Sequence, residues 1–382
     1  MNRSYDFIVA GAGMVGSAIA MGLAGLGRRV LMLDGADTDY RAAKANFGLV
    51  WVQGKGYGNV PYQRLSHEAG RLWPEFARDL ERETGMTLQY ENRGGLHFCL
   101  GQHEFEDRAA RMRLWDANTP ELPASIEMLD AGELTRRFPT LRLGREVSGA
   151  SFCDRDAHVN PLRLLAALQA AYLRRGGLLY SRRPVTAIEP LAGGGFAVIA
   201  AAGREGAAPE RYEAANVVIA AGLGSAALGG MVGLDVPLRP QRGQLLVTER
   251  LAPMLPLPAS GVRQTGEGTV MIGVTQEEVG YDLNTTADAA ARMSRKALRV
   301  LPDLAGARLV RQWSCLRVMT PDGRPVYAGS AQYSGAWTAL CHSGVTLASF
   351  HAGPLARALD HGALPATLDA FHHERFDVSQ AA

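Results

Sequence analysis

The sequence has few cysteines, few lysines and almost no net charge. Its cysteines stand far apart and form no CxxC pair, which argues against a disulfide framework, a zinc site or an iron–sulfur cluster of its own; they are Cys99, Cys153, Cys315 and Cys341. Lysine occurs only at positions 44, 55 and 296, and arginine supplies the other basic residues. The net charge of +2 gives no reason to expect nucleic acid or an anionic membrane surface as a partner.

A long apolar run is also missing. The uncharged stretch of residues 217–234 is interrupted by five glycines and begins like a strand, so it predicts a buried turn region and not a membrane span. The chain enters a predicted strand almost at once, which leaves no room for a signal peptide. We therefore expect a cytoplasmic protein, or one held at a membrane surface through a partner. Its 382 residues suffice for two domains, or for one domain with a large insertion.

What the sequence does have is a glycine-rich segment near its N-terminus. Residues 6–16 read Asp-Phe-Ile-Val-Ala-Gly-Ala-Gly-Met-Val-Gly, and residues 30–34 read Val-Leu-Met-Leu-Asp. In such a strand–turn–helix–strand unit, Gly11 allows the tight turn, Gly13 lets a pyrophosphate approach the backbone, and Gly16 lets helix and strand pack closely. Asp34 can accept a hydrogen bond from a ribose hydroxyl. The segment predicts dinucleotide binding; the alternative is an ordinary glycine-rich turn in another α/β unit.

The remaining periodicity predicts an α/β protein. We expect helices over residues 66–83, 104–118, 162–175, 287–301 and 346–359, and strands over residues 94–100, 178–180, 217–220 and 269–273. Pro161 suits the first turn of the third of these helices. The alternation predicts two domains interleaved in sequence, with the nucleotide domain assembled from several pieces.

Two features favour FAD over NAD as the dinucleotide. The fingerprint lies at the N-terminal end of the sequence, and a strand near the middle of the chain ends in Ala220-Ala221-Gly222, a turn of small residues that can pass close to a bound cofactor. Residues 222–227 are similar to a second fingerprint, but no acid closes a following βαβ unit there. With no predicted NADPH site, the substrate itself would reduce the flavin.

Four more segments extend this pattern. They are Lys44-Ala45-Asn46-Phe47-Gly48-Leu49; Val159-Asn160-Pro161 followed by Pro184-Val185 and residues 218–222; residues 240–244; and residues 315–323 together with residues 341–347. With the fingerprint, in which Asp34 stands where Glu is usual, they resemble the D-amino-acid oxidase superfamily of FAD enzymes over nearly the whole chain. The last pair is most similar to the group formed by the C subunit of hydrogen cyanide synthase, the B subunit of opine oxidase and the β-subunit of D-hydroxyproline dehydrogenase. Glycine oxidase and sarcosine oxidase come next.

The resemblance implies an α/β fold with α+β elements, in which a Rossmann-type FAD-binding domain is interleaved with a β-sheet substrate-binding domain. This is the glutathione-reductase-like or D-amino-acid-oxidase fold. The FAD-binding domain would comprise residues 1–82, 150–235 and 314–382. The substrate-binding domain would comprise residues 83–149 and 236–313.

The resemblance also implies an activity. Members of the superfamily transfer a hydride from a carbon bonded to nitrogen onto flavin N5, and water hydrolyses the resulting imine to a 2-oxo acid. The substrate would be an amino acid or amine with a carboxylate: an opine, or an N-alkyl, D- or cyclic amino acid. Relatives in the nearest group work in heteromers with a second FAD-binding subunit and an iron–sulfur component. The alternatives are, from another class, a non-catalytic or electron-relay FAD-binding subunit and, third, an aromatic hydroxylase that needs NAD(P)H.

Cofactor-binding residues follow from the matched segments. They are Gly11, Gly13, Met14, Val15, Gly16, Asp34, Lys44, Ala45, Asn46, Gly48, Leu49, Val185, Ala221 and Gly222. At the flavin, the backbone N–H groups of Gly344, Val345 and Thr346 would start a helix and stabilise negative charge on the N1–C2=O edge. Cys315 aligns with the cysteine that binds FAD covalently in sarcosine-oxidase relatives. The Leu-Arg pair after it is of the glycine-oxidase kind, so we expect a buried free thiol, with the covalent bond as the alternative.

Three residues are implied as catalytic. Arg317 aligns with the arginine that pairs with the substrate carboxylate, a role that suits the guanidinium fork; the alternative is a salt bridge. His342 would face the substrate, or only pack beside the flavin ring. Tyr281 would replace the substrate-positioning tyrosine that relatives carry before residues 269–273. No lysine stands near residues 277–283, where sarcosine oxidases hold the lysine that activates oxygen, which favours a dehydrogenase. No metal site is expected.

Overall fold

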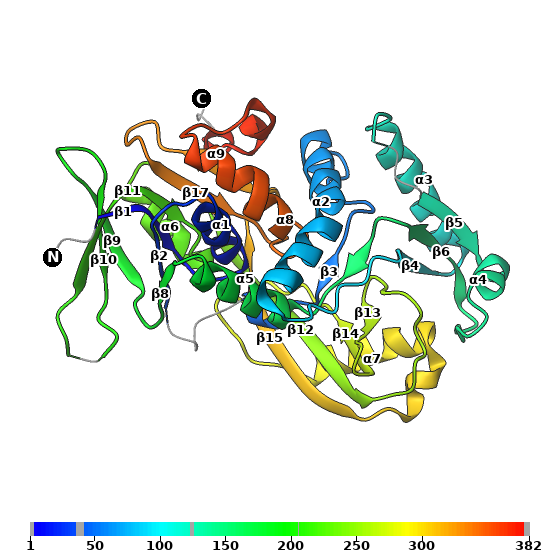
Figure 1. The fold of residues 1–382 in the computed structure, drawn as a ribbon. Helices are drawn as coiled ribbons and strands as arrows, with labels where there is room; N and C mark the ends of the chain where they lie inside the picture. Colours follow the sequence, from blue (N-terminus) through cyan, green and yellow to red (C-terminus); the bar gives the residue numbers. More distant parts are fainter. Residues whose placement is uncertain (1–3, 36–41, 123–125, 205, 378–382) are drawn as a thin grey trace.

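The computed structural model describes residues 4–35, 42–122, 126–204 and 206–377 (of Lys44, the backbone only). The largest sheet has eight strands, and its main path runs β16-β17-β11-β1-β2-β8 (Figure 1). Strands β17, β11, β1, β2 and β8 are parallel, whereas β16, β10 and β9 pair antiparallel. The bounds are β1 Ser4–Ala10, β2 Val30–Leu33, β8 Leu178–Tyr180, β9 Val185–Pro190, β10 Phe196–Ala200, β11 Glu210–Ile219, β16 Val326–Gly329 and β17 Ala336–Leu340.

Helices cover the parallel part of this sheet because its strands are apolar on both faces. Along β1, Phe7 and Val9 belong to the core that includes α1 (Met14–Gly25) and α5 (Pro161–Arg174). Ile8 and Ala10 belong to the core on the other side, with β10 and α6 (Ser225–Gly230). Alternate residues of a strand point to opposite faces, so this short strand joins two cores.

A second part of the molecule is built on two smaller sheets. The three-stranded sheet has the order β4-β6-β5 and the four-stranded sheet the order β13-β14-β12-β15. Both contribute to one apolar core with helix α7 (Ala287–Val300). The strand bounds are β4 Gly95–Leu100, β5 Ile126–Asp130, β6 Val147–Cys153, β12 Arg239–Arg250, β13 Val262–Gln264, β14 Thr269–Gly273 and β15 Leu309–Met319; β3 Leu49–Val50 and β7 Ala157–His158 form a separate pair.

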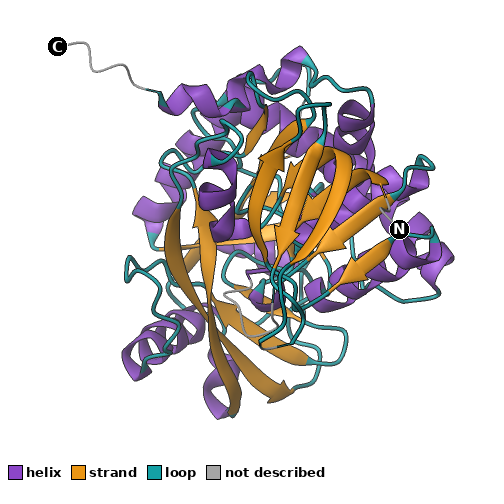
Figure 2. Ribbon diagram, turned by 90° about the vertical axis from the view of Figure 1, so that its left-hand side faces the viewer, coloured by secondary structure: helices purple, strands orange, loops and turns teal. Residues whose placement is uncertain are grey.

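Five further α-helices in the described residues complete the fold. They are α2 (Val60–Thr84), α3 (Gln102–Ala117), α4 (Ala131–Arg137), α8 (Ala348–Phe350) and α9 (Ala356–Asp360). Figure 2 looks onto the side that carries β9 and β10 and shows strands in front of the helices. None of the helices within the described ranges is long and apolar enough to cross a membrane.

The expected elements are present, and several of them have different starts. Strand β11 begins at residue 210 and not 217, and α3 at residue 102 and not 104. Helix α2 begins at residue 60 and not 66 because the Asn59 side chain accepts the N–H of Tyr62 and Pro61 occupies the first turn, both helix-start features. The C-terminal helix begins at residue 348 and not 346, and it contains a π-helical turn at His351–Leu355 around Pro354. The division into two domains stays a proposal; strand β15 crosses its boundary at residue 314.

Candidate functional site

One cavity of about 970 Å³ connects the large sheet with the four-stranded sheet. Its volume is at the upper end of the usual range for a small-molecule site. One part of its wall is formed by the glycine turn after β1, the end of β2 and the turn after β11, and another part by β15 and residues 339–346. Segments far apart in the sequence therefore meet around one space.

The three fingerprint glycines have different surroundings. A Cβ on Gly11, whose φ is +106°, would lie 2.4 Å from the carbonyl oxygen of Ala220, and a Cβ on Gly16 would lie 1.9 Å from that of Gly11. Both positions are therefore closed to larger residues by the protein's own backbone. A Cβ on Gly13 would meet only Ala43, at 3.9 Å. Gly13 is left open on the cavity side, which suits a ligand that approaches the backbone closely.

Helix α1 offers this end of the cavity its N-terminus. Gly13 caps the helix without a side-chain hydrogen bond, so the first-turn N–H groups of Met14 and Val15 remain for a ligand. Asp34 follows β2 directly and lines the same space, as do Val185, Ala221 and Gly222. An open glycine, uncapped helix N–H groups and an acid fit the pyrophosphate and ribose of a dinucleotide.

The segment between the two ends is held by an asparagine turn. The Asn46 side chain accepts the N–H of Gly48 at 2.7 Å, and a Cβ on Gly48 would lie 2.4 Å from the carbonyl oxygen of Val159. Ala45, Asn46 and Leu49 line the cavity, whereas Gly16 and Gly48 pack behind it. The side chain of Lys44 lies outside the described part of the structure.

Gly344, Val345 and Thr346 line the cavity as a turn that leads into α8. This turn adjoins the start of α1, since a Cβ on Gly344 would lie 3.3 Å from the Cβ of Met14. Two tryptophans fix this turn: the Trp73 indole donates to the carbonyl oxygen of Thr346 at 2.8 Å, and the backbone N–H of Trp51 donates to the Thr346 hydroxyl at 3.2 Å. The turn is thus held by hydrogen bonds from two other segments of the protein.

Arg317 reaches the cavity from β15. Its guanidinium donates to the side-chain oxygen of Gln241 at 3.0 Å and to the carbonyl oxygen of Thr275 at 2.8 Å. Burial lowers the pKa of Arg317, but a guanidinium stays protonated in proteins. Both of its partners are neutral, and within the described residues it forms no ion pair with a carboxylate. The charge remains for a ligand.

A glycine on the neighbouring strand makes room for this arginine. Gly243 on β12 pairs with Cys315, and a Cβ at residue 243 would lie 2.6 Å from a guanidinium nitrogen of Arg317. Gly243 lines the cavity as well. Any larger residue here would have to move the guanidinium.

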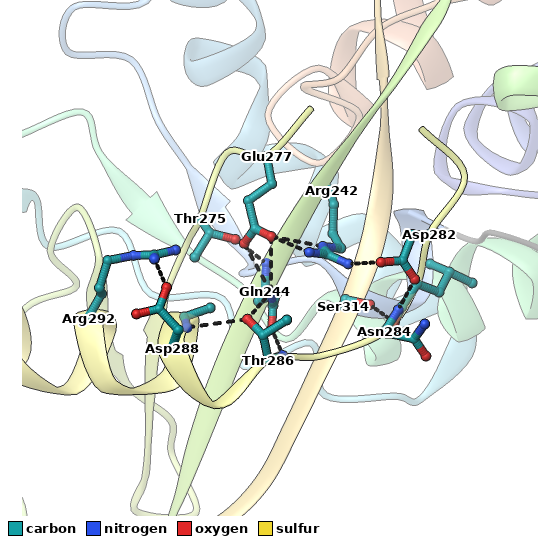
Figure 3. A network of polar contacts seen from close by, with 12 residues as sticks. Arg242, Gln244, Thr275, Glu277, Asp282, Asn284, Thr286, Asp288, Arg292 and Ser314 are labelled. Atoms are coloured by element: carbon teal, nitrogen blue, oxygen red, sulfur yellow. Dashed lines mark hydrogen bonds and ion pairs between the residues drawn. The ribbon is translucent and has the colours of Figure 1, made fainter. Parts of the chain in front are cut away.

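A polar network holds the loop that follows β14, as Figure 3 shows. Arg242 pairs with Glu277 at 2.6 Å and with Asp282 at 2.5 Å. The side chain of Gln244 donates to Glu277 and accepts the N–H of Thr286, both at 3.0 Å. This network fixes the loop that presents the carbonyl oxygen of Thr275 to Arg317 and places Tyr281 at the cavity wall.

The structure brings the other predicted residues to the same cavity. Burial lowers the pKa of His342 to about 3, and the charges of Lys55 and Arg317 contribute, so the imidazole is neutral. Tyr281 lines the cavity but its side chain is more than half exposed. Cys315 is buried, and burial raises the pKa of its thiol, which disfavours the thiolate.

Two of the cavity residues that sequence reasoning missed bear on its chemistry. One is Gly243, which the sequence indicates only as part of a matched segment, because its function depends on a cross-strand neighbour. The other is Lys55, which lines the cavity beside Ser343. The scarcity of lysine is the only signal for it in the sequence, since one of three lysines stands six residues after the predicted cofactor segment.

These features define a dinucleotide-binding protein in which one cavity can hold both a cofactor and a substrate. The family model described as DAO, FAD dependent oxidoreductase, matches residues 6–358. The chain therefore belongs to this family of FAD-dependent oxidoreductases, and the predicted family and fold class are confirmed.

Individual relatives match along the full length. The B subunit of opine oxidase from Agrobacterium tumefaciens (strain Ach5) is 39% identical over 98% of this chain and 99% of its own, and that from Rhizobium meliloti is 37% identical over the same shares. The crystal structure of glycine oxidase from Geobacillus kaustophilus superposes with a TM-score of 0.87 at 24% identity, over 97% of this chain and 99% of that one.

Proposed function

We propose that this protein oxidises the C–N bond of an amino acid or secondary amine that carries a carboxylate. The single observation that carries the proposal is the continuity of the cavity from the dinucleotide turn to Arg317, a cation without a carboxylate partner within the described residues. The names of the relatives, an opine oxidase and a glycine oxidase, support the same reaction class. An opine or an N-alkyl, D- or cyclic amino acid would be the substrate.

In this proposal, Arg317 binds the carboxylate and so fixes the position of the adjacent carbon–nitrogen bond. The bound FAD supplies the chemistry of accepting a hydride from that carbon. His342 is kept neutral between two cations, so it neither competes for the carboxylate nor repels a developing positive charge on nitrogen. Tyr281 would contact the substrate from the mouth of the cavity.

The backbone N–H groups of Gly344, Val345 and Thr346 would face the flavin, where they would stabilise the negative charge that develops on it. We propose that FAD is held without a covalent bond. The protonated, buried thiol of Cys315 donates to the carbonyl oxygen of Ala45 at 3.8 Å. Denaturation should therefore release the flavin into the supernatant, whereas a yellow precipitate would show a covalent bond.

We also propose that the protein works in a heteromer with a second FAD or iron–sulfur subunit, which would take up the electrons. The support is that the relatives with 39% and 37% identity are named as subunits of opine oxidase. Purification of the chain with and without its neighbouring gene products, followed by size-exclusion chromatography, tests this association.

The activity is tested with the purified yellow protein under anaerobic conditions. Opines and N-methyl, D- and cyclic amino acids are added one at a time while the visible spectrum is recorded. Bleaching of the flavin by one class supports the proposal and identifies the substrate class. Retained FAD with no bleaching by any member would contradict it and favour an electron-relay subunit, and bleaching by NADPH alone would favour a hydroxylase.

A further inference from the structure

A second cation faces the cavity at the same end as Arg317. The ammonium group of Lys55 donates to the hydroxyl of Ser343 at 2.7 Å, and that hydroxyl lies 2.9 Å from the hydroxyl of Tyr62. Ser343 and its neighbour His342 line the cavity, as Lys55 does. The His342 imidazole is within the electrostatic reach of both Lys55 and Arg317. The two cations therefore belong to one site.

Neither cation is neutralised by the residues that the structure describes. The acids with an influence on them are Glu277 for Arg317 and Asp156 for Lys55. Glu277 is paired with Arg242 at 2.6 Å, and Asp156 is occupied by the loop that carries Lys55. Burial of two positive charges without counter-charges is costly, so the cavity is complementary to a ligand with two negative charges.

The loop that carries Lys55 is fixed from both sides. The Asp156 carboxylate accepts the backbone N–H groups of Val52 at 2.6 Å and Gln53 at 3.2 Å, together with the Gln53 side-chain amide at 2.5 Å. The Trp115 indole donates to the carbonyl oxygen of Lys55 at 2.7 Å. Lys55 is thus held in place by buried groups that contribute nothing else to the cavity.

We propose that Lys55 is a specificity-determining residue that binds a second carboxylate, so that the preferred substrates are secondary amines carrying two carboxylates. Arg317 would hold the carboxylate next to the oxidised carbon, and Lys55 the carboxylate on the other substituent of the nitrogen. The reaction part of this inference rests on the proposed function, whereas the binding of a dianion does not depend on it. Lys55 would be the group by which this site distinguishes dicarboxylic from monocarboxylic amines.

The kinetic test uses two substrates that differ by one carboxylate, N-methylglycine and N-(carboxymethyl)glycine. In the wild-type protein, kcat/KM for flavin reduction should be at least about tenfold higher for the dicarboxylate, since a charged hydrogen bond contributes roughly that factor or more. Lys55→Met should keep its FAD and lower kcat/KM for the dicarboxylate to about that for N-methylglycine, which abolishes the difference. Lys55→Arg should keep part of the preference.

Lys296→Met is the matched control, because Lys296 is exposed on α7 and its loss should change neither substrate. An equal loss for both substrates in Lys55→Met would overturn the proposal, since it would place the ammonium group at the flavin or in the fold. Unchanged kinetics for both would overturn it too.

A binding test on the wild-type protein needs neither turnover nor a folded variant. Glutarate and butyrate are titrated while the flavin absorbance is followed. Glutarate should bind at least about tenfold more tightly, and equal affinities would overturn the proposal. If glutarate binds more tightly but no amine reduces the flavin, the proposed reaction fails and the dianion site stands. If amines reduce the flavin without regard to a second carboxylate, the reaction stands and the role of Lys55 fails.

Discussion

The two ends of the cavity are built in different ways. At the nucleotide end, the groups offered to a ligand are mostly backbone atoms of one short stretch, Gly13 to Val15, with Asp34 close behind. At the substrate end they are side chains brought together from strands and loops far apart in the sequence, such as Lys55 and Arg317. At the first end a larger residue would occupy the space of the ligand, whereas the second end depends on the identity and position of individual side chains. Substitutions at the first end should therefore weaken FAD binding, and substitutions at the second should weaken substrate binding.

The largest effect is expected at the nucleotide end. Gly13→Val should weaken FAD binding at least about 100-fold, because its side chain would fill the space left for the pyrophosphate and block the N–H groups of the turn. The fold should persist, since a Cβ at this position meets no protein atom closer than 3.9 Å. Fluorescence titration of the apoprotein with FAD measures the effect. The control, Gly193→Val, lies in a loop with open space and should bind FAD normally; equal affinity in both variants would contradict the assignment of this end.

Arg317→Met addresses the substrate end with the next largest effect. The variant should keep its FAD but lose roughly 100-fold in kcat/KM for amino acids, because the carboxylate loses its charged hydrogen bonds. Arg317→Lys should recover only part, since an ammonium group cannot present the bidentate fork. Stopped-flow reduction of the flavin gives the rates, and unchanged kinetics would remove Arg317 from the site.

Gly243→Ala is a subtler change at the same end. The added methyl would stand 2.6 Å from a guanidinium nitrogen of Arg317, so the arginine must shift and KM should rise about tenfold, with FAD binding unaffected. Gly306→Ala, where no atom lies within 4 Å of the added Cβ, is the control. A KM within twofold of wild type in both variants would mean that the guanidinium adapts freely.

The pH dependence of the two ends should differ as well. Burial lowers the pKa of Lys55 to about 8, below that of an exposed lysine, so the ammonium form dominates below pH 8 and is lost above it. KM for a dicarboxylate should rise severalfold between about pH 7 and 9. Lys55→Met and monocarboxylic substrates should not show this step.

Three of the groups facing Lys55 do not titrate in that interval, whereas Asp156 does so at its lower limit. Burial lowers the pKa of His342 to about 3 and raises that of Cys341 to about 12, and burial raises the pKa of Tyr62 further above its usual value. Burial raises the pKa of Asp156 to about 7, at the lower limit. An Asp156→Asn variant that keeps the step would assign it to Lys55, and one that loses it would assign it to Asp156.

The smallest effect is expected for Tyr281. Its side chain is 56% exposed at the cavity wall, so Tyr281→Phe should change kcat/KM less than about threefold, the scale of a solvent-exchanged hydrogen bond. The same stopped-flow assay measures it. A loss comparable to that of Arg317→Met would show that the loop closes over the substrate and buries the hydroxyl.

The contrast between the ends also explains what sequence reasoning can predict. The dinucleotide turn is local, so the spacing of three glycines and an acid is enough to predict its geometry. Arg317, His342 and Cys315 are located by a family resemblance, which supplies their positions but no partners. Gly243 and Lys55 need the register of β12 against β15 and the fold of residues 51–58, since neither contact is between neighbours in the sequence. Apolar periodicity alone places the start of α2 too late, although Asn59 and Pro61 indicate it.

The position of Lys55 limits how such an enzyme can be re-engineered by exchange of modules. Arg317 lies on the four-stranded sheet, whereas Lys55 stands only six residues after Leu49, the last residue of the proposed cofactor segment. In a chimera that receives the smaller sheets of another enzyme, the residue at position 317 would come from the donor, whereas Lys55 would remain from the recipient. If both cations bind substrate as proposed, substrate preference is shared between the two parts of the chain, and its transfer to another enzyme would require both of them.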